Sequence, residues 1–433
     1  MMAMNNDIIP PERLNSLKRP AHGMMPSLRL RGHTPQDAQA RLDRDRPADQ
    51  LLRSVASSLG DRPASPSSSD PPDKVRQKWY RRRKIWLLAA TVVMVSATAL
   101  LAWLLVLRAD PAPPAQVAAK PKAPAPPPQP TIVPSPLTGL GVPPESAKRP
   151  VTGIMIENSP DARPQSGLRD AGIVFEAVAE GGITRFLALY QEAQPSYVGP
   201  VRSLRPYYLD WLAPFDAAVA HVGGSRDALD QVRSGMKDLD QFINGSSFWR
   251  INERYAPHNV YTSFEKLNAL NQSKGYTSSN FLPWPRKKET KPSTAPAARG
   301  IDIKISGFLY NPHYDYDPVT NSYLRSQGGK SHVDILGQDD KVGKQLAPKV
   351  IIVLAMNYSY GPANDGTRSS YATTGGGKLW VFQDGAVLEG SWEKAGRQTN
   401  FSFKNAAGQP IAFNPGQTWV SIVSTTTSVS YVP

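Results

Sequence analysis

The 433-residue sequence contains no cysteine. This absence excludes a disulfide scaffold, a zinc site with thiolate ligands, a cysteine nucleophile and a lipid anchor on an acylated cysteine. The H-E-x-x-H pattern of zinc peptidases and the G-x-S-x-G elbow of serine hydrolases are also absent. The sequence therefore predicts no metal site, and it leaves the cofactor and any catalytic residue unknown.

Negative charge is scarce relative to positive charge, with 36 Asp+Glu against 50 Lys+Arg and a net charge of +14. A basic protein invites a nucleic-acid interpretation. However, residues 1–84 alone carry 17 basic and 9 acidic residues, whereas residues 150–433 carry 28 and 25. The region that resembles a folded domain is nearly neutral, so we expect no nucleic-acid partner.

Residues 85–107 contain no charged residue. A helix of this length spans about 35 Å, which is enough to cross a hydrocarbon core of about 30 Å. The apolar stretch exceeds a signal-peptide core of about 7–15 residues. Seven basic residues precede it within residues 74–84, and only Arg108 follows closely. The positive-inside rule then predicts a single-pass membrane protein with residues 1–84 in the cytoplasm and the later residues extracellular.

The segments on both sides of this span have compositions typical of unfolded chain. Residues 1–84 are rich in Arg, Asp, Pro and Ser, which predicts a disordered basic tail, with a short helix possible near residues 35–59. The basic cluster before the span would lie on anionic lipid head groups. Residues 110–136 contain 11 prolines, so residues 108–145 are expected to form an extended linker on the outer side.

The remaining sequence predicts two ectodomains joined by a linker or loop at residues 286–300. Residues 146–285 alternate strand-like segments (151–158, 171–180, 184–192, 216–222) with helical ones (207–212, 226–239), which is typical of a mixed α/β structure. Residues 301–433 contain short strand-like stretches and an Asp384-Gly385 hairpin signal. These stretches predict a mostly-β domain resembling a small sandwich or barrel.

Several ordered motifs resemble one bacterial family. The first half carries GIMIENSPDARPQSGLRDAGIVFEAVAEGGITRFLALYQ (153–191), GPVRSLRPYYLDW (199–211), HVGGS (221–225) and APHNVYTS (256–263). The second half carries YDYDPVTNSYLRSQGGKSHVD (314–334), GGGKLWVFQDGAVLEGSWEK (375–394) and NPGQTW (414–419). Together they are similar to the YerB-type family, a domain of unknown function with N- and C-terminal parts. The resemblance implies an envelope protein without an established activity. Because no cysteine exists to be acylated, the apolar helix would replace the lipid anchor that is frequent in the family.

Two clusters in the first ectodomain are candidate ligand sites. Arg202 and Arg205 are three residues apart, so a helical turn would bring both guanidinium groups to one phosphate or carboxylate. The alternative is a structural pair with carbonyls or carboxylates. His221, Gly223, Gly224 and Ser225 end a strand and open a helix, where backbone N–H groups favour an anion. The alternative, with Ser225 as an ordinary N-cap, is favoured for this second cluster.

Other polar groups have weaker claims. Paired carboxylates among Glu157, Glu176 and Glu180 would act as general acid and base or bind a cation. Salt bridges to arginines are the favoured interpretation. Arg254, His258 and Asn259 form a polar loop in which the histidine is a base, a ligand or a hydrogen-bonded support. A nucleophile pair of Ser203 or Ser225 with a histidine, and a metal-ligand pair of His332 and Asp334, have little support.

Three functions stay open at this point. The first is a membrane-anchored envelope protein that binds an anionic or polar ligand, such as a cell-wall polymer or an envelope protein, through its first ectodomain. The second is an envelope hydrolase or phosphoryl-type transferase that uses Arg202 and Arg205 to hold an oxyanion. The third is a signalling or interaction protein that acts through its cytoplasmic tail.

Overall fold

The computed structural model describes residues 80–108, 131–290, 296–363, 366–425 and 428–433. Residues 1–79 of the predicted disordered tail, the possible helix near residues 35–59 and most of the proline-rich linker lie outside these residues. The chain divides into two units, residues 1–122 and 123–433, and each is considered by itself.

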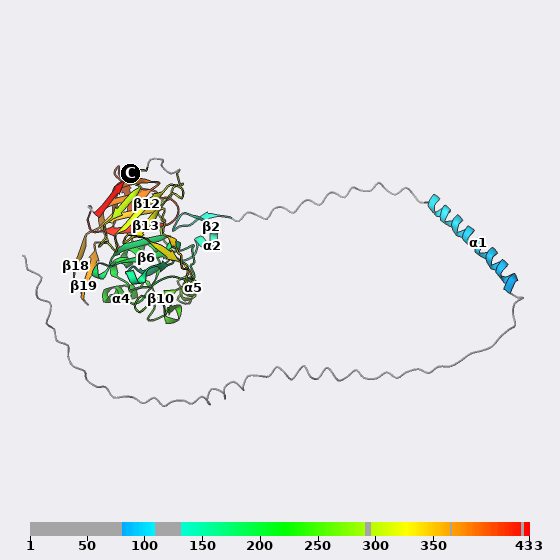
Figure 1. Ribbon diagram of the computed structural model, residues 1–433, viewed down its shortest axis with the longest axis horizontal. Helices are drawn as coiled ribbons and strands as arrows, with labels where there is room; N and C mark the ends of the chain where they lie inside the picture. Colours follow the sequence, from blue (N-terminus) through cyan, green and yellow to red (C-terminus); the bar gives the residue numbers. More distant parts are fainter. Residues whose placement is uncertain (1–79, 109–130, 291–295, 364–365, 426–427) are drawn as a thin grey trace, which may run out of the picture. The chain divides into compact units, whose positions relative to one another are not determined.

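The first unit contains one helix, α1 (Tyr80–Leu107), among its described residues (blue in Figure 1). It begins five residues before the predicted span, so the RRRK basic cluster belongs to the helix. Its segment Ala90–Leu107 is long and apolar enough to cross a membrane, and none of this segment is buried. The hydroxyls of Ser96 and Thr98 bond back to the carbonyls of Val92 and Met94, at 2.7 and 2.9 Å, which satisfies them within the helix.

The second unit contains short helices and many strands. The helices are α2 (Pro144–Ala147), α3 (Pro206–Leu212), α4 (Arg226–Arg233) and α5 (Phe264–Ser273). The strands of the first half are β1 (Val133–Pro134), β2 (Gly141–Val142), β3 (Thr152–Glu157), β4 (Gln165–Ser166), β5 (Ile173–Val178), β6 (Thr184–Tyr190), β7 (Ala218–His221), β8 (Lys237–Asp240), β9 (Phe248–Arg250) and β10 (Val260–Thr262). Those of the second half are β11 (Gly300–Ile303), β12 (Pro312–Asp317), β13 (Ser322–Gln327), β14 (Lys330–Ser331), β15 (Val333–Ile335), β16 (Lys344–Gln345), β17 (Val350–Ala355), β18 (Tyr358–Ala363), β19 (Gly366–Tyr371), β20 (Gly375–Gln383), β21 (Ala386–Lys394), β22 (Ser402–Asn405), β23 (Thr418–Val423) and β24 (Val429–Val432).

One ten-stranded sheet combines strands from both predicted ectodomains, in the order β22-β21-β20-β17-β23-β5-β6-β3-β7-β8. The two halves join at β23, which pairs in parallel with β17 on one side and with β5 on the other. The ranges 146–285 and 301–433 therefore divide the sequence, while in space they share this sheet.

Each face of the sheet buries its own apolar side chains. Alternate residues of β17 show this: Ile352 and Leu354 join a cluster with Trp211 and Trp284 on one face, whereas Ile351 and Val353 point to the other face. That second face carries two clusters. One lies beneath α5 and the β9–β10 hairpin, and the other lies beneath a five-stranded antiparallel sheet, β14-β13-β12-β11-β24.

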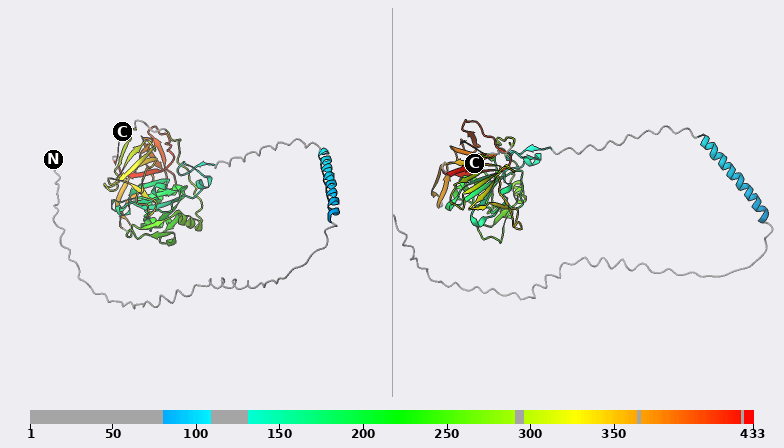
Figure 2. Two further views of the ribbon diagram at one scale, coloured as in Figure 1. Left: turned by 45° about the vertical axis from the view of Figure 1, so that its right-hand side comes forward. Right: turned by 45° about the horizontal axis from the view of Figure 1, so that its top comes forward.

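This layering confirms the expected mixed α/β first half and mostly-β second half. Figures 1 and 2 show the helices α4 and α5 at one end of the second unit and most strands of the second half at the other end. The predicted hairpin is present as β20 and β21, joined at Asp384 and Gly385, whose φ angles are 57° and 71°. Two left-handed residues in succession are what a tight two-residue hairpin requires.

One predicted helix is shorter than expected. The sequence predicted a helix from Arg226 to about Leu239, but α4 ends at Arg233 and Leu239 is buried in β8. Gly235 adopts a φ of 123°, which lies outside the helical region and separates the two elements.

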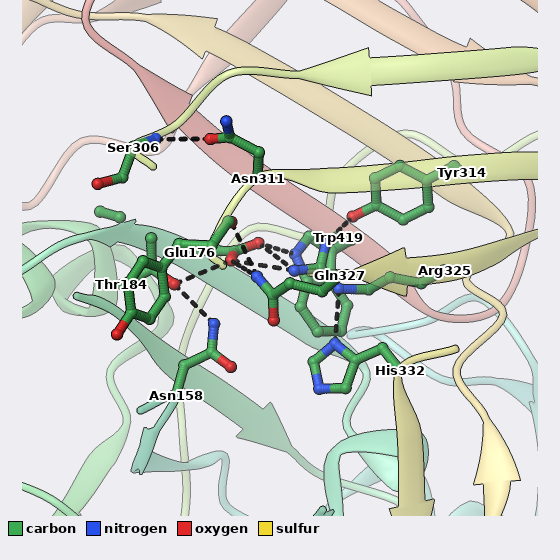
Figure 3. Close-up of polar contacts among 12 residues, drawn as sticks. Asn158, Glu176, Thr184, Ser306, Asn311, Tyr314, Arg325, Gln327, His332 and Trp419 are labelled. Carbon is green, nitrogen blue, oxygen red and sulfur yellow. Dashed lines mark hydrogen bonds and ion pairs between the residues drawn. The ribbon is translucent and has the colours of Figure 1, made fainter. Parts of the chain in front are cut away.

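A fully buried ion pair connects the two halves where the apolar clusters of the second face meet. Glu176, on β5, lies between Val174 of one cluster and Val178 of the other, and its carboxylate accepts two bonds of 3.0 and 2.9 Å from Nη2 of Arg325, on β13. Both side chains are 0 % exposed. Figure 3 shows that the indole of Trp419, on β23, also reaches this carboxylate, at 2.9 Å.

The guanidinium of Arg325 is enclosed by partners. Its Nε donates to Nδ1 of His332 at 2.9 Å, and its Nη1 donates to the hydroxyl of Tyr314 (Figure 3). The group lies 4.4 Å from the centre of the Trp419 ring, which is within cation–π range. A buried charge without such partners would strongly destabilise the fold, so each partner matters to this arrangement.

We expect Arg325→Met to lower the free energy of unfolding by about 3–5 kcal/mol, because it leaves the Glu176 carboxylate buried without its counter-charge. The measurement is urea unfolding of the full chain in detergent, followed by tryptophan fluorescence. The control is Lys378→Met, which breaks a half-exposed pair with Glu389 and should cost no more than about 1 kcal/mol. Equal losses in both variants would contradict a special role for the buried pair.

Candidate functional site

Charged side chains gather where several parallel strands of the ten-stranded sheet end. Strands β3, β5 and β7 run in one direction, and β6 lies antiparallel between β3 and β5. In open α/β sheets ligands bind outside the carboxyl ends of the strands. We use "carboxyl edge" for the charged residues at this end: Glu157, Glu180, Arg185, Arg202, Arg205 and His258.

The centre of the carboxyl edge is Glu157, the last residue of β3. Its carboxylate lies 3.2 Å from Nε of Arg202 and 3.0 Å from Nδ1 of His258. The hydroxyl of Ser159 is 3.1 Å from the same carboxylate. The side chain of Glu157 is only 5 % exposed, whereas those of Arg202 and His258 are 23 % and 22 % exposed. The carboxylate is thus covered, and the two nitrogen-bearing side chains are partly exposed to solvent.

A second ion pair lies further along the carboxyl edge. Arg205 holds the Glu180 carboxylate through both Nε and Nη2, the latter at 2.6 Å, and Nη2 of Arg185 lies 3.8 Å from the same group. Burial would raise the pKa of Glu180, but the hydrogen bond and charge of Arg205, with the charge of Arg185, outweigh it and lower the pKa. Glu180 therefore stays ionised, and Arg205 is engaged by it.

The segment that carries Arg202 and Arg205 is extended, so the expected helical turn is absent. Val201 bridges to β3, Leu204 bridges to Gly224, and Arg205 has extended backbone angles just before α3. The two guanidinium groups consequently meet different carboxylates. Each arginine therefore forms the ion pair with a carboxylate that the sequence analysis gave as the alternative. Binding of one anion by both arginines stays a prediction.

The cluster from His221 to Ser225 supports the fold. His221 is buried, with Nδ1 2.8 Å from the Gly223 carbonyl and Nε2 2.9 Å from Asp238. Gly223 has a φ of 58°, a conformation that suits glycine, and Ser225 caps α4 by accepting a bond from the N–H of Ala228 at 3.3 Å. The favoured interpretation of Ser225 as an N-cap is confirmed, and both nitrogens of His221 are occupied.

The loop between β9 and β10 brings His258 to Glu157, while its other candidates serve the loop. Asn259 accepts a bond of 2.7 Å from Arg250 and donates to the Ile251 carbonyl. Arg254 donates to the Pro164 carbonyl at 2.6 Å, which ties the loop to the segment after β3. The hydroxyl nearest His258 is Ser159, at 3.2 Å, rather than the expected Ser203 or Ser225.

His332 and Asp334 are buried and do not form a metal site. Since Nδ1 of His332 accepts from Arg325, its Nε2 donates to Oε1 of Gln165 at 2.9 Å. Burial and the charges of Arg325 and Arg163 hold the pKa of His332 well below its usual range, so this ring is neutral. Asp334 accepts bonds from the backbone N–H groups of Gly167 and Leu168. Among the described residues no group of three or more His, Asp or Glu side chains is arranged to hold a metal ion.

Sequence reasoning missed the residues that join the halves, above all Arg325 and Trp419. One signal was present: Tyr323, Arg325 and Gln327 alternate on β13 and all three are buried. An arginine at an inward position of a strand requires an acidic partner, but the sequence does not reveal that this partner is Glu176.

The fold and the edge define a class: a two-part α/β protein in which the second part completes the sheet of the first. Two family models match it, the "Protein of unknown function (DUF3048) N-terminal domain" over residues 137–277 and the corresponding C-terminal domain over residues 301–420. The chain is 34 % identical over 301 residues to "Putative lipoprotein YerB" of Bacillus subtilis (strain 168), covering 67 % of this chain and 86 % of that protein.

A solved structure agrees with these matches. The crystal structure of the YerB protein from Bacillus subtilis superimposes with a TM-score of 0.62 at 32 % identity, covering 70 % of this chain and all of that one. The chain therefore belongs to the DUF3048 family of YerB, as its motifs indicated.

The environment of Asp334 generates a pH prediction. Burial raises its pKa to about 7 in the folded chain, and the backbone N–H groups of Leu168 and Arg169 oppose the shift. The unfolded value is about 3.9, so between pH 4 and pH 7 the folded state retains a proton that the unfolded state releases. The contribution of Asp334 to stability is therefore largest below pH 4 and falls as the pH rises to 7.

We expect Asp334→Asn to remove this pH-dependent contribution to the free energy of unfolding. Relative to the unsubstituted chain, the variant should gain stability as the pH rises from 4 to 7, by at most about 1.4 kcal/mol per pH unit. The check is urea unfolding at a series of pH values, with exposed Asp339→Asn as the control. Parallel pH profiles for the unsubstituted chain and Asp334→Asn would contradict the shift.

Proposed function

We propose that the protein is anchored in the cell membrane by α1 and binds an anionic or polar envelope ligand, most suitably a cell-wall polymer, at its carboxyl edge. The observation that carries the proposal is the arrangement around Glu157: a covered carboxylate holds Arg202 and His258, and these two are partly exposed to solvent. The similarity to a protein described as a lipoprotein supports an envelope location.

The geometry assigns the two arginines different tasks. Arg202 forms an ion pair with Glu157 through its buried Nε, and no hydrogen bond among the described residues uses its Nη1 or Nη2, so it retains these donors for a ligand. Arg205 is 13 % exposed and is bound through two nitrogens by Glu180. Arg202 and His258 are therefore the ligand-contacting residues of the proposal, and Arg205 with Glu180 positions the segment between them. This segment begins with Gly199 and Pro200, which are joined by a cis peptide bond.

The topology is part of the proposal. The positive-inside rule favours a cytoplasmic location for residues 1–84, because the basic residues precede the span. The folded second unit then lies outside the cell, attached through the proline-rich segment. A polyproline linker is a semi-rigid spacer of about 3.1 Å per residue, which suits a domain that must reach a wall layer.

The absence of cysteine permits a direct test of this topology. We expect Ser278→Cys, at an exposed position of the second unit, to react with a membrane-impermeant maleimide in intact cells. Ser67→Cys, in the N-terminal segment, should react only after the cells are permeabilised. The unsubstituted chain is the blank because it has no thiol. Labelling of Ser67→Cys in intact cells would refute the proposed orientation.

Ligand binding is tested by sedimentation of the full chain, in detergent, with purified cell-wall sacculi. Sacculi stripped of phosphodiester-linked polymers by acid serve for comparison. Because charge-assisted hydrogen bonds dominate such contacts, we expect Arg202→Gln/His258→Gln to weaken binding by at least about tenfold. Lys266→Gln/Lys274→Gln, on α5 and at its C-terminal end, removes at least as much positive charge away from the carboxyl edge, and this control should bind normally. Unchanged binding in Arg202→Gln/His258→Gln would overturn the site.

One observation favours a second candidate, an envelope hydrolase or phosphoryl-type transferase. Because Glu157 engages Nδ1 of His258, Nε2 is left as the nitrogen that exchanges a proton with a substrate, as in general acid–base catalysis. Ser159 lies at Nδ1 rather than Nε2, so these residues do not form a Ser–His nucleophile pair. The same sacculus incubation separates the candidates: release of soluble fragments that is lost in His258→Gln indicates catalysis, and binding without release indicates a binding protein.

A further inference from the structure

A second cleft is lined in part by Pro160, Arg163 and Pro164, in the segment that follows Glu157. It has a volume of about 410 Å³, which is within the range of small-ligand sites. Its walls come from the segment after β3, from the turn between β13 and β14 and from the Leu309 region, so both halves of the chain form it. We call it the Arg163 cleft, after the residue that forms its base.

Arg163 is held rigidly by the chain around it. Its Nε donates to Oδ1 of Asn158 at 3.0 Å, and its Nη2 donates to the carbonyls of Asn158 and Leu309, both at 2.8 Å. Its guanidinium lies 5.4 Å from the centre of the Tyr310 ring. None of these bonds uses Nη1, which lies on the side of Gly328 at the cleft wall. A fixed guanidinium with a donor directed at a cleft is preorganised for an anion.

The lining of the cleft contains the cations Arg163 and Lys330 but no Asp or Glu. Arg163 and Arg325 both lie near the buried carboxylate of Glu176. Arg325 already donates to both oxygens of this carboxylate. Burial lowers the pKa of Arg163, and the neighbouring charge of Arg325 lowers it further, while Glu176 and Tyr310 act in the opposite direction. Exposed Lys330 adds a cation at the rim, and exposed Asp161 adds an anion beside Arg163 in sequence. A bound anion would restore the balance.

The cleft also contains an acceptor that the fold does not satisfy. Gln327 is 5 % exposed, and its Nε2 donates to the Tyr310 carbonyl at 2.8 Å. Its Oε1 has no hydrogen-bond partner among the described residues. Figure 3 shows this oxygen directed away from Glu176. This oxygen is itself buried, and a buried unsatisfied carbonyl is costly, so a small turn of the Gln327 side chain toward a ligand that donates an N–H or O–H would be favoured.

The rest of the lining is partly apolar: Pro160, Pro164, Leu309 and Val333 contribute apolar surface beside Ser331 and His332. We propose that the Arg163 cleft binds the free C-terminus of a short peptide with small apolar side chains. The carboxylate is placed at Nη1 of Arg163, an amide N–H at Oε1 of Gln327, and the side chains against the prolines and Leu309. A sugar acid has the carboxylate and the donors but not the apolar groups, so a peptide fits this cleft better.

The probe is N-acetyl-Ala-Ala, added to the full chain in detergent and followed by ligand-observed saturation-transfer NMR. We expect saturable binding by the free acid and at least about tenfold weaker binding by the C-terminal amide, which lacks the charge. Arg163→Gln should weaken binding of the acid by a similar factor. Because Arg163 also supports the fold, a second variant is required: Ser331→Trp fills the exposed mouth of the cleft from β14 and should abolish binding.

Ser370→Trp, at an exposed position of β19 away from the cleft, is the matched control and should bind as the unsubstituted chain does. Equal affinity for the acid and the amide, unchanged binding in Ser331→Trp, or no saturation up to about 20 mM would overturn the proposal. Tighter binding of glucuronic acid than of the dipeptide would overturn the peptide assignment. These results are independent of polymer binding at Glu157, because the cleft uses different residues.

Discussion

The buried ion pair of Glu176 and Arg325 is the interaction on which the architecture depends. It lies where two apolar clusters on the same face of the sheet meet, and both charged side chains are fully buried there. Since a lone buried charge is strongly unfavourable, the carboxylate of the first half requires the guanidinium of the second half. The pair thus specifies how the halves dock more than it adds stability. Trp419 reinforces the specification, because it belongs to the strand that joins the two parts and contacts both charged groups.

Local patterns predicted the elements of this protein well. Alternation in residues 349–356 and 417–424, and the Asp384-Gly385 turn, correspond to β17, β23 and the β20–β21 hairpin. Their pairing was not predictable, because a strand buried on both faces gives a continuous apolar run that does not identify its neighbours. The same limit explains α4: the helical pattern continued through residues 234–239, but a glycine in a left-handed conformation ended the helix and a strand followed.

The candidate site was predicted in part. The sequence identified Arg202 and His258 but not Glu157 as the group that unites them, since the two residues lie 56 positions apart and meet only through the ends of neighbouring strands. His221 was chosen for its glycine-rich surroundings, yet these glycines serve a tight strand-to-helix connection. In both cases the residue type indicated a polar contact, but the arrangement of the strands determined which residue is the contact partner.

The position of β23 in the sheet has a consequence for how the chain is made. Strand β5 pairs with β6 on one side, but its other side is completed only by β23, which is synthesised long after β5. Until then the first half presents an unpaired strand edge, a known template for association with other chains. The nascent chain would therefore have to keep this edge away from other chains until β23 fills it, so the spacing between nascent chains becomes part of its folding environment.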